Sequence, residues 1–194
     1  MADATATIYL CRHGDTAWSP ERRLAGRTDL PLTEAGEATA RRLRAKLASV
    51  TFDRVWVSPL GRARRTAELA GFGERAVVDA RLVEMDFGAY DGRTVAEIRV
   101  ERPGFAYLRD GNPGGESPED LAARADAVLA DLRAAGGTTL IVGHSVLHRV
   151  TAARWLGLAP GFARHLQVGP GAIGVLAYDQ VEDAPAIASW NDRS

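Results

Sequence analysis

Short apolar runs recur along the chain between longer polar stretches, and each run predicts a buried β-strand. The main runs cover residues 7–11, 54–58, 77–78 and 138–142. Apolar runs of this length, bounded by turn-forming residues, are typical of strands that are covered on both faces. Two further strands are expected at 172–178 and 186–190. Because no helix separates these last two, we expect them to pair antiparallel at or near one edge of a sheet.

Amphipathic stretches with helix start signals lie between most of the predicted strands. The expected helices cover residues 33–49, 59–70, a short stretch after Thr94, 117–135 and 145–156. Thr33 and Ser117 are suitable N-caps, and Pro118 suits the first helical position. Thr94 and Glu97 have the spacing of a capping box. Two polar stretches, 15–32 and 80–93, are expected to be long loops, which are often functional.

The alternation of strands and helices predicts the fold class. It indicates an α/β, three-layer sandwich in which a mainly parallel sheet is covered by helices on both faces. The chain has 194 residues and contains no repeat or linker, so we expect one domain over residues 1–194. Ligands of such folds bind beyond the carboxyl ends of the strands. Catalytic and ligand-binding residues are therefore expected at those ends.

Composition narrows the class of protein further. The net charge of −1 argues against a nucleic-acid or membrane-surface protein, because both usually carry a clear basic excess. Cys11 is the only cysteine, so a disulfide framework is impossible, and its apolar surroundings predict a buried small hydrophobe. No apolar run approaches the length of a membrane span, and no secretory signal is evident. We therefore expect a cytoplasmic enzyme.

Two histidines follow equivalent strand ends. His13 comes after Arg12 at the end of the first strand, and His144 follows the apolar strand 138–142. Arg62 lies just after the end of the second strand. Two guanidinium groups and two imidazoles at one edge could bind the oxygens of a phosphoryl group while one imidazole attacks phosphorus.

Ordered sequence blocks around these residues resemble a known family. The blocks are Arg12-His13-Gly14-Asp15-Thr16-Ala17-Trp18, residues 26–36, Ser58-Pro59-Leu60-Gly61-Arg62-Ala63, residues 82–88, Gly114-Gly115-Glu116-Ser117 and Val142-Gly143-His144. In this order and over nearly the whole chain they resemble the histidine phosphatase superfamily, in its phosphoglycerate-mutase-like branch. The match of residues 84–92 is to the phosphatase-type members. The resemblance implies a metal-independent phosphomonoester hydrolase.

The resemblance also implies residue roles. His13 is the expected nucleophile of a phosphohistidine intermediate, and Glu84 is the expected general acid and then base. Phosphoryl oxygens and substrate are expected to contact Arg12, Ser19, Arg23, Gly26, Arg62, His144 and Ser145. Ser19 stands where the family often has Asn, and Ser145 where it often has Gly, and both departures bear on substrate specificity more than on reaction class. We expect no cofactor, no metal and a small phosphorylated substrate, and a homodimer is left open.

Two other sequence patterns compete with this interpretation. His144 and His148 have a zinc-binding spacing on a helix, but no acidic third ligand is evident. His148 and His165 are therefore expected at the surface or at the rim of the site. The G-x-G-x-x-G match at 169–174 precedes a strand and so fails as a dinucleotide site.

Two rival functions stay open. One is a cofactor-dependent phosphoglycerate mutase, which needs a second cationic subsite and protection of the phosphohistidine from water. Arg99, Arg102 and Arg109 are candidates for such a subsite. The other is a catalytically silent protein that binds a phosphate ligand.

Overall fold

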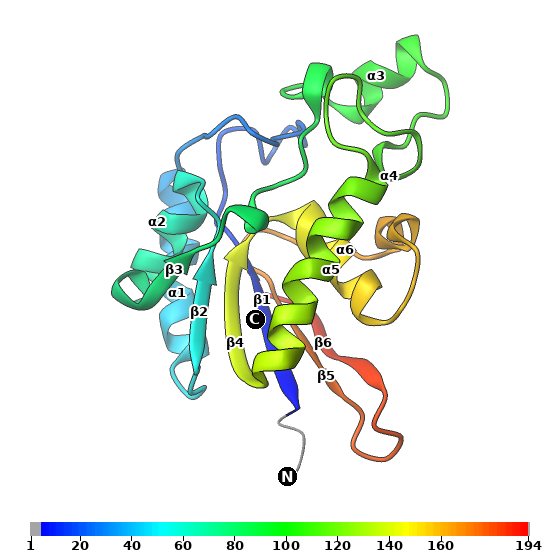
Figure 1. Ribbon diagram of the computed structural model, residues 1–194. Helices are drawn as coiled ribbons and strands as arrows, with labels where there is room; N and C mark the ends of the chain where they lie inside the picture. Colours follow the sequence, from blue (N-terminus) through cyan, green and yellow to red (C-terminus); the bar gives the residue numbers. More distant parts are fainter. Residues whose placement is uncertain (1–4, 194) are drawn as a thin grey trace.

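A six-stranded sheet forms the centre of the computed structural model, which describes residues 5–193 (Figure 1). The strands are β1 (Ala6–Arg12), β2 (Arg54–Val57), β3 (Ala76–Val78), β4 (Gly137–Gly143), β5 (Ile173–Tyr178) and β6 (Pro185–Asp192). Their order across the sheet is β3-β2-β4-β1-β5-β6. The first four in this order run parallel, whereas β5 is antiparallel to both β1 and β6. The predicted mainly parallel sheet with an antiparallel strand near one edge is confirmed.

Helices cover both faces of this sheet (Figure 1). They are α1 (Glu34–Leu47), α2 (Gly61–Leu69), α3 (Val95–Glu101), α4 (Tyr107–Asp110), α5 (Pro118–Ala135) and α6 (Ser145–Trp155). Successive strand residues point to opposite faces, so Leu10 and Ile141 pack into the core beneath α5 and α6. Their neighbours Cys11 and Val142 pack into the core beneath α1 and α2. The three-layer architecture is therefore confirmed.

The predicted helix starts are present as capping interactions. The Thr33 hydroxyl accepts a hydrogen bond from the Gly36 N–H at 3.0 Å at the start of α1. Thr94 forms a capping box with Glu97 before α3, and Ser117 forms one with Asp120 before α5. Each cap satisfies backbone N–H groups that a helix leaves without partners at its first turn.

The structure differs from the sequence expectation mainly in short elements. The helix expected from residue 59 begins at Gly61, and the last strand continues to Asp192. The short helix α4 and 3₁₀ turns at Gly73–Arg75, Ala80–Leu82, Gly88–Tyr90 and Pro160–His165 were not predicted. One-turn elements bury too little surface to need a repeating apolar pattern, so the sequence carries no periodic signal for them.

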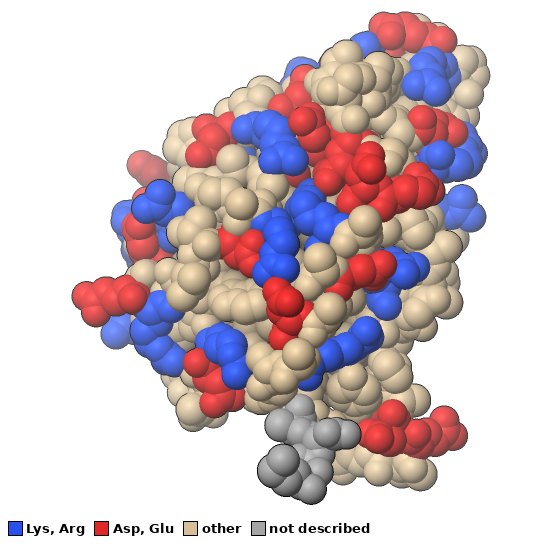
Figure 2. All heavy atoms as spheres, viewed as in Figure 1, with Lys and Arg blue, Asp and Glu red and all other residues tan. Residues whose placement is uncertain are grey.

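The direction of the strands sets where a site can form. The carboxyl ends of β1, β2 and β4 lie at one edge of the sheet, which is the upper edge in Figure 1. Because β5 runs the opposite way, its first residues lie at the same edge, and so does the last part of β6. Acidic and basic side chains are interspersed over the face seen in Figure 2. None of the helices within residues 5–193 is long and apolar enough to cross a membrane.

Candidate active site

His13 lies directly beyond β1 and is held in one tautomer. Its backbone N–H donates to the Gly143 carbonyl at 3.0 Å, and its side chain is only 5% exposed. The ring nitrogen Nδ1 lies 2.7 Å from the Gly14 carbonyl oxygen. A carbonyl oxygen only accepts hydrogen bonds, so Nδ1 carries the proton and Nε2 keeps its electron pair. This is the state that the nucleophile of a phosphoryl transfer requires.

Burial and nearby cations keep the His13 ring neutral. Burial lowers the pKa of His13 well below its usual value, and the positive charges of Arg12 and Arg62 lower that pKa further. Both effects disfavour the charged imidazolium. The ring is therefore an available nucleophile near neutral pH, as expected from its place beside Arg12.

Arg62 is buried and Arg12 is half-buried beside this ring, and both leave part of their donor capacity unused. Arg12 donates from Nη1 to the Val168 carbonyl at 2.5 Å, and its buried Nε has no hydrogen-bond partner. Arg62 donates from Nη1 to the Thr28 carbonyl and from Nη2 to the Gly26 carbonyl, both at 2.8 Å. Its Nε is likewise without a partner. Buried donors without partners are costly, and an oxyanion would satisfy them.

His144 precedes α6 and lies against His13. The two rings are 5.2 Å apart between centroids at an interplanar angle of 64°. Nε2 of His144 lies 2.7 Å from the Ser58 hydroxyl, and Nδ1 has no partner. Burial, and then the neighbouring His13, lower the pKa of His144 well below its usual value. Strand ends β1, β2 and β4 therefore bring His13, Ser58 and His144 together.

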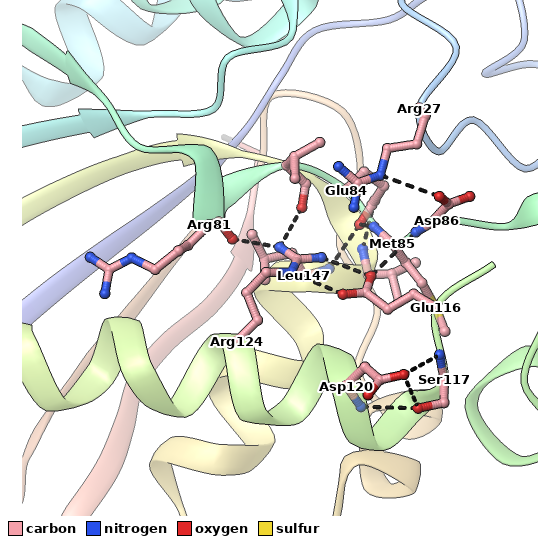
Figure 3. Close-up of polar contacts among 12 residues, drawn as sticks. Arg27, Arg81, Glu84, Met85, Asp86, Glu116, Ser117, Asp120, Arg124 and Leu147 are labelled. Atoms are coloured by element: carbon pink, nitrogen blue, oxygen red, sulfur yellow. Dashed lines mark hydrogen bonds and ion pairs between the residues drawn. The ribbon is translucent and has the colours of Figure 1, made fainter.

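Glu84 follows the turn Ala80–Leu82 and is directed at the start of α6 (Figure 3). The side chain is 4% exposed. Its Oε1 accepts hydrogen bonds from the N–H groups of Met85 at 2.9 Å and Leu147 at 3.0 Å, and Oε2 accepts one from Val146 at 3.0 Å. Backbone groups thus fix both oxygens. The sequence alone favours a solvent-exposed carboxylate at position 84. The structure instead buries Glu84 within the site.

A cavity of about 440 Å³ opens over these residues. Its walls include most of the residues predicted to bind or act on substrate, namely Arg12, His13, Ser19, Arg23, Glu84 and Ser145. Arg62, His144 and Gly26 are buried and are not among the residues that line it. The Gly26 N–H already donates to Asp91 at 2.8 Å, and its carbonyl accepts from Arg62. Gly26 thereby positions Arg62 through its backbone.

Several cavity residues were missed by sequence reasoning. They include Arg22, Tyr107, Arg149, Gln167, Asn191 and Arg193. A topological signal existed for three of them, because residues before an antiparallel β5 and at the end of β6 must reach the same edge as His13. Arg22 and Asn191 both adopt a φ of 55°, a left-handed conformation that non-glycine residues seldom adopt. Such backbone strain gathers at functional sites, but the sequence gives no sign of it.

One expectation about the titratable residues was wrong. His148, expected at the surface or rim, is 1% exposed, because the inner face of α6 packs it beneath Gly143. His165 is exposed, as predicted. The arginines considered for a second anion subsite point elsewhere, since they bond to other groups and do not line the cavity. Arg99 donates to the Phe105 carbonyl, Arg102 to the Tyr90 hydroxyl and Arg109 to Asp110.

Because His148 is buried, we expect it to change how the free energy of unfolding depends on pH. Neither ring nitrogen has a partner, and burial lowers the pKa of His148 to about 3. The unfolded chain binds this proton below about pH 6.5 whereas the folded chain does not, so stability falls as pH falls from about 6.5 toward 3. His148→Leu should remove about 1.4 kcal/mol per pH unit from that dependence. Denaturant unfolding at pH 7 and pH 5 measures it.

The exposed His165 provides the matched control for this measurement. His165→Gln should leave the pH dependence of the unfolding free energy unchanged, because the His165 side chain is exposed to solvent in the folded chain as well as in the unfolded one. An equal pH dependence in His148→Leu and the parent chain would show that His148 gains a proton in the folded state.

Within residues 5–193 no group of three or more His, Cys, Asp or Glu side chains is placed to hold a metal ion. His144 and His148 have a spacing that can bind zinc on a helix. Both side chains are buried, His148 on α6 and His144 directly before it.

Known proteins resemble this chain in sequence and in fold. A "Probable phosphoglycerate mutase GpmB" of Klebsiella pneumoniae is 34% identical over 192 residues, which cover 94% of this chain and 88% of that protein. A solved structure of an open reading frame product from Mycobacterium tuberculosis superposes with a TM-score of 0.89 at 30% identity, covering 96% of this chain and 97% of that one. A mycobacterial glucosyl-3-phosphoglycerate phosphatase has a TM-score of 0.83 at 28% identity, covering 96% and 99%.

The family model agrees with these likenesses over almost the full length. The model of the histidine phosphatase superfamily, branch 1, matches residues 8–193 and so includes every residue of the site. The match covers the strand ends that carry His13, Arg62 and His144. With the sheet, the buried histidine pair and the family match in agreement, the chain belongs to branch 1 of the histidine phosphatase superfamily.

Proposed function

We propose that this protein hydrolyses phosphate monoesters of small metabolites through a phosphohistidine at His13, without a metal ion. The observation that carries the proposal is the His13 tautomer. The Gly14 carbonyl holds the proton on Nδ1, so Nε2 can attack phosphorus in a cavity that also contains Arg12 and Glu84. A silent binding protein would not need a neutral imidazole in this state.

In the first step, Nε2 of His13 forms a bond to phosphorus as the bond from phosphorus to the ester oxygen breaks. Arg12 and Arg62 have unused Nε donors beside the ring, and these can bind the equatorial oxygens as negative charge develops. Glu84 gives its proton to the departing alkoxide, which leaves as an alcohol.

In the second step, a water molecule attacks the phosphorus of the phosphohistidine. Glu84, now a carboxylate, takes a proton from that water as the bond from nitrogen to phosphorus breaks. Phosphate is released and Nε2 regains its electron pair. Glu84 lines the cavity, and its position at the start of α6 keeps it on the same side in both steps.

The charge of the cavity supports an acidic substrate. Arg22, Arg149 and Arg193 line it in addition to Arg12, one of the two arginines assigned to the phosphoryl group. Arg149 donates to the Ala163 carbonyl and the Tyr107 hydroxyl, so no carboxylate neutralises it in those contacts. Among the residues 5–193 that line the cavity, Glu84 is the only one with an acidic side chain. A phosphomonoester with a further carboxylate or phosphate would offset this positive charge.

Phosphoglycerate mutase activity is the second candidate, for two reasons. The curated relative bears that name, and the cavity arginines could hold the second phosphate of a bisphosphorylated intermediate. Hydrolysis remains the better proposal because the glucosyl-3-phosphoglycerate phosphatase shares the fold at a TM-score of 0.83. The stretch after Glu84 is also short and acidic and resembles that of the phosphatase-type members, whereas the family's mutases carry an aromatic and basic insertion there.

A direct assay separates the two activities. The enzyme is given 3-phosphoglycerate with 2,3-bisphosphoglycerate as primer, and 2-phosphoglycerate and free phosphate are followed together. We expect phosphate release to exceed isomerisation, and p-nitrophenyl phosphate to be hydrolysed after exhaustive dialysis against chelator. Isomerisation that is much faster than phosphate release would establish the mutase instead. Activity lost on dialysis and regained with a divalent ion would contradict the metal-free mechanism.

A further inference from the structure

We infer that Arg124 and Glu116, both outside the cavity, form a positioning pair for Glu84. The inference rests on the proposed role of Glu84 as the proton donor. Glu84 lies on a loop without regular hydrogen bonding, between the turn Ala80–Leu82 and the turn Gly88–Tyr90. A proton donor must be placed within hydrogen-bonding reach of the leaving oxygen. The loop therefore needs support from elsewhere in the fold.

Arg124 of α5 holds the chain on the amino-terminal side of Glu84 (Figure 3). Its Nη1 donates to the Arg81 carbonyl at 2.5 Å and to the Val83 carbonyl at 2.7 Å. These carbonyls lie three residues and one residue before Glu84. The guanidinium thus fixes the backbone from which the Glu84 side chain projects.

Glu116 holds the chain on the carboxyl-terminal side. Its backbone N–H donates to the Asp86 carbonyl at 2.9 Å, and its Oε2 accepts from the Asp86 N–H at 3.3 Å. Its two carboxylate oxygens also accept from Arg124, at 2.9 Å from Nε and 2.8 Å from Nη2. One bidentate ion pair therefore connects both flanks of Glu84 (Figure 3).

The pair is well placed to be rigid. The Arg124 and Glu116 side chains are only 15% and 12% exposed. The loop that carries Glu116 also packs tightly on the loop after Glu84, because a Cβ on Gly115 would come within 2.5 Å of the Asp86 carbonyl oxygen. Guanidinium geometry suits this task, since its planar group can serve a carboxylate and two carbonyls at once, which a lysine ammonium cannot.

The test is Arg124→Lys in the full-length enzyme, with glycerol phosphate and p-nitrophenyl phosphate as paired substrates. A glycerol alkoxide needs protonation to leave, whereas nitrophenolate needs little. We expect kcat for glycerol phosphate to fall between about 10-fold and 100-fold, the size expected when a catalytic group is displaced by roughly 1 Å. The loss for p-nitrophenyl phosphate should stay below about 3-fold. Glu116→Gln, a milder change at the other half of the pair, should show the same selectivity.

Two controls separate positioning from general stability. Arg154 of α6 makes a comparable bidentate pair with Asp126 and donates to the Leu158 carbonyl, so Arg154→Lys is the matched substitution. It should leave the ratio of the two rates unchanged. In a Glu84→Gln background, Arg124→Lys should add less than about 2-fold, because the group that it positions is already gone.

Equal losses for the two substrates, or full additivity with Glu84→Gln, would overturn the positioning role while leaving the proposed reaction intact. If Glu84→Gln itself shows no preference for good leaving groups, the general acid is wrongly assigned, and both the proposed mechanism and the positioning role fail. Circular dichroism and thermal unfolding of each variant show that the rates refer to folded enzyme.

Discussion

Replacing His13 with alanine should lower phosphomonoester hydrolysis by at least about 10⁴-fold, the order of loss that follows removal of a nucleophile from an otherwise intact site. The substitution removes the Nε2 electron pair that the hydrogen bond from Nδ1 to the Gly14 carbonyl leaves free. Rapid quenching of the parent enzyme with a labelled phosphomonoester should trap label on the protein. That label should be labile in acid and stable in base, as a phosphorus–nitrogen bond is.

The exposed His165 offers a matched control, since His165→Ala removes a ring that lies outside the cavity. That variant should keep parental turnover and labelling. Label that resists acid would indicate a phosphoserine instead, and Ser58, whose hydroxyl lies 2.7 Å from His144, would then be the candidate nucleophile.

Glu84→Gln should lower hydrolysis of alcohol phosphates by about 10²- to 10⁴-fold, and that of p-nitrophenyl phosphate much less. The amide cannot supply the proton that an alkoxide leaving group needs. It also places an NH₂ group against a backbone N–H of Val146 or Leu147, so a destabilisation of about 1–3 kcal/mol is expected as well. Steady-state rates over a series of aryl and alkyl phosphates measure the first effect, and denaturant unfolding measures the second.

Glu119→Gln is the control for the charge change, because Glu119 is exposed in the first turn of α5. It should alter neither the rates nor their dependence on the leaving group. A uniform loss over the whole series in Glu84→Gln would restrict Glu84 to the water step or to holding α6 in place.

The regular elements could be predicted because burial leaves a pattern in the sequence. The apolar run 138–142 became the centre of β4, paired with β1 and β2, and the Ser117-Pro118 start signal marked α5 at its first residue. The short helix α4 could not be predicted, because four residues bury too little to need a period. His148 was predicted at the surface or rim because histidine is a polar residue, whereas its position on α6 faces the core.

The reacting groups were also foreseeable, since strand ends in a parallel sheet meet at one edge. Arg12, His13 and His144 were placed by that rule, and Glu84 only by the family resemblance. The other residues that line the cavity are placed by loops that fold over this edge of the sheet. Nothing in the local sequence places Arg149 beside the Tyr107 hydroxyl, because that contact joins residues 42 positions apart.

Cys11 is buried in strand β1, so chemical labelling of its thiol can report when the centre of the sheet opens. Strand β1 lies between β4 and β5, and the Cys11 side chain is fully buried in the core beneath α1 and α2. Burial raises the pKa of the thiol to about 12. The reactive thiolate is therefore scarce, and an added thiol reagent has no route to the sulfur in the closed sheet. Since Cys11 is the only cysteine, every labelling event counts one opening of the sheet centre. The rate at which the sheet opens can thus be measured under native conditions, without denaturant and without an engineered probe.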